Sequence, residues 1–169
     1  GTLLQNEPSK KDGNFDYFAG IMKPKKQELQ SDIAIIGGGP GGYVAAIQAA
    51  KMGAKVVLIE KESLGGTCLN RGCIPTKALV SSAKVYKNLK EASNFGCCAE
   101  NVSADIKKII DRKNHTVSLL VDGIKYILDK HNVKVINGFG KIKDERTVFV
   151  KEGLKEITIK TKNIIIATG

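Results

Sequence analysis

"DIAIIGGGPGGYVAAIQAAKMGAKVVLIEKE", residues 32–62, decides the fold of this chain. An apolar run is followed by a glycine-rich turn, an alanine-rich segment with helical periodicity, a glycine at position 53 and a second apolar run. This order predicts two parallel strands joined by a helix, which is the building unit of a doubly wound sheet. The predicted fold class is therefore α/β.

The glycine-rich turn matches G-x-G-x-x-G through Gly37, Gly39 and Gly42. In that pattern the first glycine permits a tight turn, the second lets the backbone approach a pyrophosphate, and the third lets the helix pack closely on the strand. The helix N-terminus then offers free N–H groups and a partial positive charge to a diphosphate. Glu60 ends the second apolar run, where a carboxylate would bind an adenosine ribose and repel a 2′-phosphate. The pattern predicts a dinucleotide site without distinguishing FAD from NAD, and a glycine-rich turn in an unrelated α/β protein is the alternative.

The rest of the chain divides into an extension, a pair of helices and several short strands. Residues 1–31 show neither helical nor strand periodicity and are predicted to be a linker or N-terminal extension, with one domain over residues 32–169. Helices are predicted over residues 77–92 and over a second amphipathic segment whose apolar residues should face the core: Ile106, Ile109, Ile110, Val117, Leu120, Ile124, Ile127 and Leu128. Strands are predicted at residues 133–136, 147–150, 157–161 and 163–169, the two middle ones antiparallel.

The composition, with 42% hydrophobic and 26% charged residues, is that of an ordinary globular protein. The net charge is +10, but the basic residues form no dense block and few aromatic residues lie between them, so no nucleic-acid partner is expected. No apolar run approaches the roughly 20 residues that span a bilayer, and the first residues lack the apolar core of a signal peptide, so no membrane association is expected. A cytoplasmic location is predicted, in a reducing compartment that disfavours structural disulfides and allows catalytic ones.

Residues 65–77, "GGTCLNRGCIPTK", place Cys68 and Cys73 five positions apart. The spacing alone is compatible with a metal pair, a structural disulfide or a redox couple. In an ideal helix, residues at this separation lie roughly 8 to 9 Å apart, beyond the roughly 7 Å within which two cysteines can be bridged. A bridge would need a distorted turn, for which Gly72 supplies backbone freedom and Pro75 is expected to kink the following helix.

Zinc is the metal alternative for these two cysteines. Structural zinc sites usually combine such a pair with a second pair or with two histidines. His115 and His131 are expected to be exposed helix residues, and the adjacent Cys97 and Cys98, expected to be small and partly buried thiols, make a poor second pair. The sequence therefore disfavours zinc, and no metal is expected.

The cysteine stretch, set between "IAIIGGGPGG", "VVLIEKE" and the final "NIIIATG", closely resembles the flavin disulfide reductases over residues 32–169. Within that family, Leu69 and the "IPTK" of residues 74–77 resemble the dihydrolipoamide dehydrogenases more than the mercuric or glutathione reductases, which favour a valine-rich version of the motif. The resemblance implies a Rossmann-type FAD-binding domain with a parallel sheet, a helical pair and a small antiparallel β-meander. Residues 32–169 would be the N-terminal portion of that domain, truncated at residue 169.

The same resemblance implies roles for individual residues. Cys68 would be the interchange thiol that receives the substrate's sulfurs, Cys73 the thiolate that lies against the isoalloxazine, and Lys77 the cation near flavin N5. The residues implied to bind the cofactor elsewhere are Gly37, Gly39, Pro40, Gly41, Gly42, Glu60, Lys61, Gly65, Gly66, Thr67, Cys68, Gly140, Thr168 and Gly169.

The implied reaction is the oxidation of dihydrolipoyl groups carried by acyltransferase or lipoyl-carrier proteins: the dithiol reduces a Cys68–Cys73 disulfide, electrons pass to FAD, and hydride leaves to NAD. In this family the NAD domain and an interface domain, which supplies a His-Glu pair across a homodimer, lie outside the region of resemblance, so residues 1–169 alone are expected to be inactive. Residues 1–31 are also compatible with a linker after a lipoyl domain. The alternatives are another flavin disulfide reductase, of mercuric or glutathione type, and a non-catalytic FAD-binding fragment.

Overall fold

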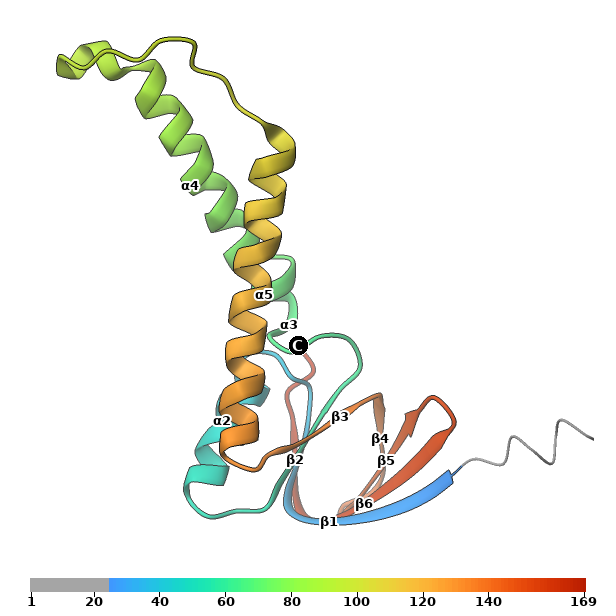
Figure 1. Cartoon of the computed structure of the whole chain (residues 1–169). Helices are drawn as coiled ribbons and strands as arrows, with labels where there is room; N and C mark the ends of the chain where they lie inside the picture. Colours follow the sequence, from blue (N-terminus) through green and yellow to red (C-terminus); the bar gives the residue numbers. More distant parts are fainter. Residues whose placement is uncertain (1–24) are drawn as a thin grey trace, which may run out of the picture.

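A computed structural model describes residues 25–169 of the chain. Its sheet has six strands in the order β3-β2-β1-β6-β5-β4 (Figure 1). The strands are β1 (Lys25–Ile36), β2 (Val56–Glu60), β3 (Lys134–Asn137), β4 (Phe139–Asp144), β5 (Thr147–Glu152) and β6 (Lys155–Ile166). The helices are α2 (Pro40–Lys51), α3 (Gly66–Asn70), α4 (Cys73–Lys90), the 3₁₀ turn η1 (Ala92–Phe95) and α5 (Ile106–Lys130).

The first four strands of that order run parallel, and β5 and β4 continue the sheet as an antiparallel meander. Helix α2 connects β1 to β2, and Ile33 of β1 lies opposite Val56 of β2. Strand β6 returns to the other side of β1, so the strand order reverses at β1, which is where doubly wound sheets bind their ligands. The prediction of an α/β fold with a parallel sheet, a helical pair and an antiparallel meander is confirmed.

Both faces of the parallel strands are covered, which explains their continuous apolar sequence. On one face, Ile35 and Leu58 pack with Leu128 of α5 and with Ala46 of α2. On the other face the meander folds over the sheet and adds a second apolar cluster, whose buried members are Ala34, Ile36, Val57, Ile59, Ile136, Val148, Val150, Ile157 and Ile159. The domain therefore consists of three layers: helices, parallel sheet and meander.

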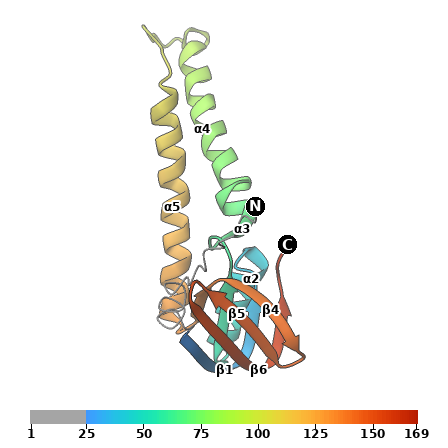
Figure 2. The same ribbon diagram turned by 90° about the vertical axis from the view of Figure 1, so that its right-hand side faces the viewer.

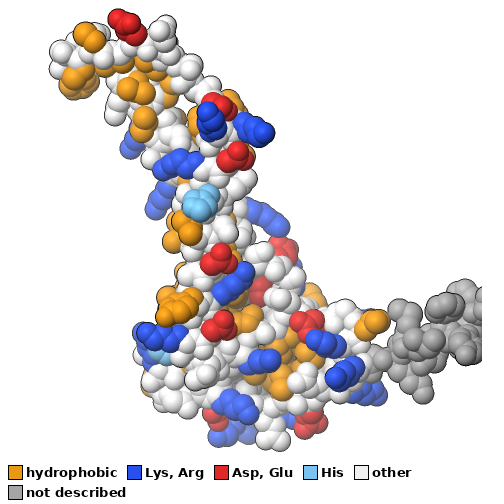
Figure 3. Space-filling view, in the orientation of Figure 1, with side chains coloured by type: hydrophobic (Ala, Val, Ile, Leu, Met, Phe, Trp, Pro, Cys, Tyr) orange, Lys and Arg blue, Asp and Glu red, His pale blue; other side chains and the backbone are white. Residues whose placement is uncertain are grey.

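Helices α4 and α5 form a long hairpin that projects away from the sheet (Figures 1 and 2). The expectation that the apolar residues of α5 all face the core is wrong. Leu128 is fully buried, but Ile106 is 68% exposed, and Ile110, Leu120 and Ile127 are exposed too. Only the C-terminal part of this 25-residue helix reaches the sheet, because a helix of that length extends about 37 Å. Apolar side chains are accordingly visible along the projecting part of the hairpin (Figure 3).

Several boundaries differ from those predicted. Residues 25–31, predicted as part of the extension, form the first half of β1 and pair with residues 155–161 of β6. They lack an apolar signature because most of their side chains are exposed. The two strands predicted at 157–161 and 163–169 form the single strand β6, and β4 was not predicted. The rest of the predicted extension, residues 1–24, lies outside the described residues.

The hairpin tip, residues 91–105, carries the two cysteines that were expected to be partly buried. Cys97 and Cys98 are both exposed free thiols, because among residues 25–169 no helix or strand packs over the tip. His115 is exposed on α5, as predicted, whereas His131 is half-buried at the C-terminal end of that helix. Within the part of the chain that the structure describes, no helix is both long and apolar enough to cross a bilayer.

Candidate functional site

The glycine-rich turn between β1 and α2 contains two glycines that no other residue can replace without displacing backbone. Gly37 has φ +108°, and a Cβ there would lie 2.1 Å from the Ala167 carbonyl oxygen. A Cβ on Gly42 would lie 1.7 Å from the Gly37 carbonyl oxygen. Gly39 differs, because the nearest atom to its Cβ position is the Cα of Gly66, at 3.8 Å. The first and third glycines of the motif therefore serve close packing, and the second leaves the backbone open to a ligand.

The N-terminus of α2 is free to bind an anion. Gly39 is its N-cap residue, no side chain caps the helix, and the first turn contains no acidic residue. Pro40 follows at the first helical position, where a missing N–H does no harm. The free N–H groups and the helix dipole therefore favour a negatively charged group such as a diphosphate.

Glu60 is fixed at the carboxyl end of β2 by two backbone donors. The Gly38 N–H donates to one carboxylate oxygen at 2.7 Å, and the Glu62 N–H donates to the other at 2.8 Å. The residue is buried. A carboxylate can accept about four hydrogen bonds, so Glu60 keeps acceptor capacity on the side that faces the cavity.

A cavity of about 530 Å³ opens at the carboxyl ends of β1, β2 and β6. Of the residues predicted to bind the cofactor, those that line it are Gly37, Gly39, Pro40, Gly41, Glu60, Lys61, Gly66, Thr67, Cys68, Thr168 and Gly169. A smaller cavity of about 280 Å³ shares four of these residues and adds Gly140. The structure therefore brings together residues from both ends of the described chain at the point where the strand order reverses.

Four predicted residues do not line these cavities. Gly42 is buried behind the turn, and Gly65 has φ +95° and donates its N–H to the Gly38 carbonyl at 2.8 Å. Cys73 and Lys77 lie on α4 with exposed side chains. Lining residues that the sequence did not indicate are Glu62, Ser63, Asn70, Arg71 and Ala167 in the larger cavity and Ile36, Ile59, Gly138 and Phe139 in the smaller one.

Cys68 and Cys73 form a disulfide across a break between two helices. Cys68 lies in α3 and Cys73 is the first residue of α4, and their Cα atoms are 4.8 Å apart, well below the helical separation. Gly72 lies in the break, as expected, but the expected kink at Pro75 is wrong. Pro75 occupies the first turn of α4, where its N–H would have no helical partner, so the helix runs through it. Cys68 is half-buried in the cavity wall, whereas Cys73 is exposed.

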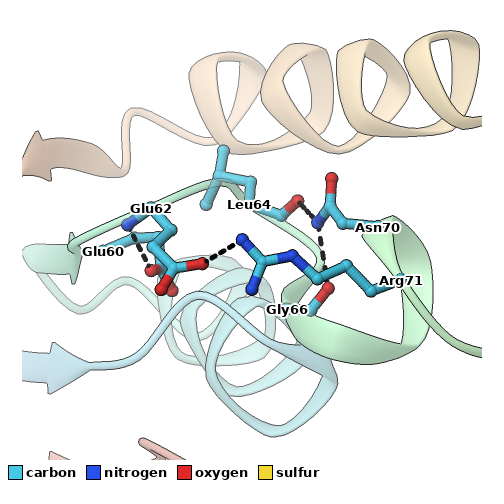
Figure 4. A network of polar contacts seen from close by, with 6 residues as sticks. All are labelled: Glu60, Glu62, Leu64, Gly66, Asn70 and Arg71. Atoms are coloured by element: carbon cyan, nitrogen blue, oxygen red, sulfur yellow. Dashed lines mark hydrogen bonds and ion pairs between the residues drawn. The ribbon is translucent and has the colours of Figure 1, made fainter.

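Two residues between the cysteines connect this turn to the loop after β2 (Figure 4). The Asn70 side-chain amide donates to the Leu64 carbonyl at 3.0 Å and to the Gly66 carbonyl at 2.9 Å. The Arg71 guanidinium pairs with the Glu62 carboxylate at 2.8 Å, and both side chains are exposed. No sequence pattern predicts these contacts, because side-chain bonds to backbone carbonyl groups can involve any acceptor residue.

The described residues contain no group of three or more His, Cys, Asp and Glu side chains that could hold a metal ion. His115 and His131 lie on α5 and at its end, on the side of the sheet that carries the helices. The site is therefore defined by a glycine-rich turn, a buried carboxylate, a cavity and a disulfide.

Comparison with known proteins connects these features. A family model described as "Pyridine nucleotide-disulphide oxidoreductase" matches residues 31–169. This region includes the glycine-rich turn, both bridged cysteines and all the residues that line the two cavities.

Curated relatives are similar over the same region. The dihydrolipoyl dehydrogenase of Acholeplasma laidlawii is 51% identical over 139 residues, which cover 82% of this chain and 40% of the relative. That of Zymomonas mobilis is 45% identical over 140 residues, covering 82% of this chain and 30% of the relative. The mitochondrial dihydrolipoyl dehydrogenase of Sus scrofa is 44% identical over 148 residues, covering 85% and 29%. The chain thus spans less than half the length of these relatives.

A solved structure shares the fold. The HOCl-induced flavoprotein disulfide reductase RclA from Escherichia coli, solved as a Cu(II) complex, superposes with a TM-score of 0.69 at 31% sequence identity. The match covers 83% of this chain and 29% of that chain.

Proposed function

Because this chain belongs to the pyridine nucleotide-disulphide oxidoreductase family, as its resemblance to the flavin disulfide reductases predicted, we propose that it holds FAD and performs the dithiol–disulfide step of a dihydrolipoyl dehydrogenase. One observation carries the proposal. Cys68 of the Cys68–Cys73 disulfide lines a cavity that begins at the glycine-rich turn, so a dinucleotide bound there would reach the disulfide.

The residues present fit FAD. Gly39 and Gly66 pack against each other in the cavity wall, and a Cβ on Gly66 would come within 2.8 Å of the Gly39 Cα. A side chain on Gly66 would push this wall apart, and a side chain on Gly39 would reduce the space along the wall where a diphosphate would bind. The free N-terminus of α2 would bind the diphosphate, and Glu60, held by two backbone donors, would accept hydrogen bonds from the ribose. Bound FAD would supply a two-electron acceptor next to the cysteines.

The cysteines would exchange electrons with a dihydrolipoyl group in two steps. A substrate thiolate attacks the Cys68 sulfur, forms a mixed disulfide and releases Cys73 as a thiolate. The second substrate thiol loses its proton and attacks its own mixed-disulfide sulfur, which closes the cyclic lipoyl disulfide and releases Cys68. Two electrons have then passed to the cysteine pair, and two protons have left the substrate thiols. Lys77, on the exposed side of α4, is proposed to place its cation near the flavin.

The finer parts of the proposal rest on the relatives named dihydrolipoyl dehydrogenase. NAD would be the final electron acceptor. The substrates would be dihydrolipoyl groups on acyltransferases or lipoyl carriers. A homodimer in the cytoplasm is proposed from the sequence and its resemblance alone, because the names of these relatives give no oligomeric state and one of them is mitochondrial. A second candidate, a flavin disulfide reductase of another specificity, is favoured by the similarity to RclA.

Two measurements on the purified chain test the proposal. Added FAD should remain bound after gel filtration at one per chain, and less should remain bound to Gly39→Val, because Gly39 lines the cavity and the new side chain would occupy part of it. Dihydrolipoamide should open the disulfide much faster than glutathione does. Absence of bound FAD would contradict the proposal, and a preference for glutathione would favour the second candidate.

A further inference from the structure

Asn70 stands between the two bridged cysteines and bonds to two residues that precede both of them, Leu64 and the first residue of α3, Gly66. It is the last residue of α3, and its side-chain amide donates to the carbonyl groups of Leu64 and Gly66 at 3.0 and 2.9 Å (Figure 4). Both N–H protons of the amide can be used in this way. The side chain is half-buried, in contrast to that of its neighbour Arg71.

The segment that Asn70 holds is itself attached to the glycine-rich turn. The Gly65 N–H, between the two carbonyl groups, donates to the Gly38 carbonyl at 2.8 Å. The Gly38 N–H in turn donates to the Glu60 carboxylate at 2.7 Å. Leu69, on the same turn as Asn70, packs against Gly65, where a Cβ would lie 2.3 Å from its side chain. Three consecutive hydrogen-bond links therefore connect the cysteine turn to the residue proposed to bind the ribose.

We infer that Asn70 is a positioning residue that couples the state of the Cys68–Cys73 pair to the shape of the cofactor cavity. The bridge fixes α3 against the start of α4, and this is the arrangement in which the amide reaches both carbonyl groups. Opening the bridge removes the covalent restraint on α3. The two hydrogen bonds of Asn70 then become weaker, and residues 64–66 lose part of what holds them against the cysteine turn, the Leu69 N–H to Gly65 carbonyl bond remaining.

The direction of the effect follows from this coupling. Because the hydrogen bonds stabilise the bridged form more than the reduced form, removing them makes the bridge easier to reduce. Complete loss of two hydrogen bonds of ordinary strength corresponds to roughly a 5- to 150-fold shift in an equilibrium constant, and loss of about two-thirds of their free energy on reduction corresponds to roughly a 3- to 30-fold shift. By reciprocity, a ligand that binds the cavity more tightly when Cys68 and Cys73 are bridged also shifts the redox equilibrium of the two cysteines toward the bridged form.

The first test measures the redox equilibrium of the bridge without flavin. In a Cys97→Ser/Cys98→Ser background only the bridged pair remains, and dithiothreitol reduces it to two thiols while closing its own ring disulfide. Asn70→Ala should shift this equilibrium toward the dithiol roughly 3- to 30-fold. The matched control is Asn88→Ala, an exposed asparagine on α4, which should match the background. A role in stability alone would destabilise both redox forms equally and leave the equilibrium unchanged.

The second test needs no variant and decides the matter if Asn70→Ala does not fold. Hydrogen exchange of the Gly65 amide, which is bonded to Gly38, should become faster when the bridge of the wild-type chain is reduced. The Thr161 amide, bonded to the Arg146 carbonyl at a distant turn, is the control and should not change. Unchanged Gly65 exchange, or a redox equilibrium of Asn70→Ala within about 2-fold of its background, would overturn the inference.

The inference rests on the proposed function only for its effect on the cofactor, and the two can fail separately. Asn70→Ala should also weaken FAD binding, read by flavin fluorescence in the bridged form. If the wild-type chain binds no FAD, the proposed function is contradicted, while both flavin-free tests still decide the role of Asn70.

Discussion

Replacing Gly42 by alanine should destabilise the domain, although alanine is the better helix former. The Cβ would lie 1.7 Å from the Gly37 carbonyl oxygen and 2.8 Å from its carbon, whereas real Cβ contacts below 3.0 Å essentially do not occur. Helix α2 or the turn would therefore have to move by more than 1 Å, and both are backbone. This lies at the upper end of overpacking costs, about 3 kcal/mol. Alanine returns about 1 kcal/mol through helix propensity, which leaves a net loss of about 2 kcal/mol.

Urea unfolding followed by circular dichroism measures this loss. With a slope of about 2 kcal/mol per molar urea, Gly42→Ala should lower the midpoint by about 1 M. Gly41→Ala is the matched control for stability, because the nearest atom to its Cβ would be the Ala167 Cβ at 3.9 Å. It should unfold at the same or a slightly higher urea concentration. A midpoint for Gly42→Ala equal to that of Gly41→Ala would refute the argument that the third glycine is required for close packing.

Three further predictions concern stability and thiol chemistry. The Lys162 ammonium, 2.7 Å away, and the Lys55 N–H hold the pKa of the Asp32 carboxyl below its usual range. Since the folded pKa lies below the unfolded value, the ionised Asp32 stabilises the fold fully above about pH 4, and this stabilisation is lost as the pH falls through the folded pKa. Urea midpoints should therefore fall less on acidification in Asp32→Asn than in wild type. Leu128→Ala, which empties a fully buried position, should cost about 2 to 5 kcal/mol, whereas Ile106→Ala, at a position 68% exposed, should change stability by less than about 0.5 kcal/mol in the same unfolding assay. Ellman's reagent should find two thiols in the native chain, the exposed pair at the hairpin tip, and four after denaturation with reduction; four in the native chain would contradict the bridge.

The βαβ unit could be predicted from the sequence because its physical requirements are local. Strands buried on both faces need continuous apolar runs, and the turn needs glycine where a Cβ would strike a carbonyl group, as at Gly37 and Gly42. Both requirements are visible in residues 32–62 without knowledge of any distant contact. The same holds for the cysteine turn, where Gly72 marks the break between two helices.

The errors arose where burial depends on distant segments. The apolar face of α5 indicated a helix but not how far it would project, so Ile106 and Ile110 were assigned to a core that only the end of the helix reaches. Residues 25–31 have no strand pattern of their own and are ordered by pairing with β6, more than a hundred residues later. The hydrogen bonds of Asn70 could not be predicted for a similar reason. Their acceptors are backbone carbonyl groups, which every residue has, so the sequence does not mark which ones the side chain will reach.

The proposed function requires that the cysteine pair and a bound flavin form one redox centre. The decisive measurement is an anaerobic visible spectrum of the FAD-loaded chain, recorded during titration with dihydrolipoamide. A long-wavelength absorption band should develop after two electrons per flavin, from the Cys73 thiolate beside the flavin, and no such band should develop in Cys73→Ser. A colourless protein, or a bound flavin whose spectrum never develops that band, would contradict it.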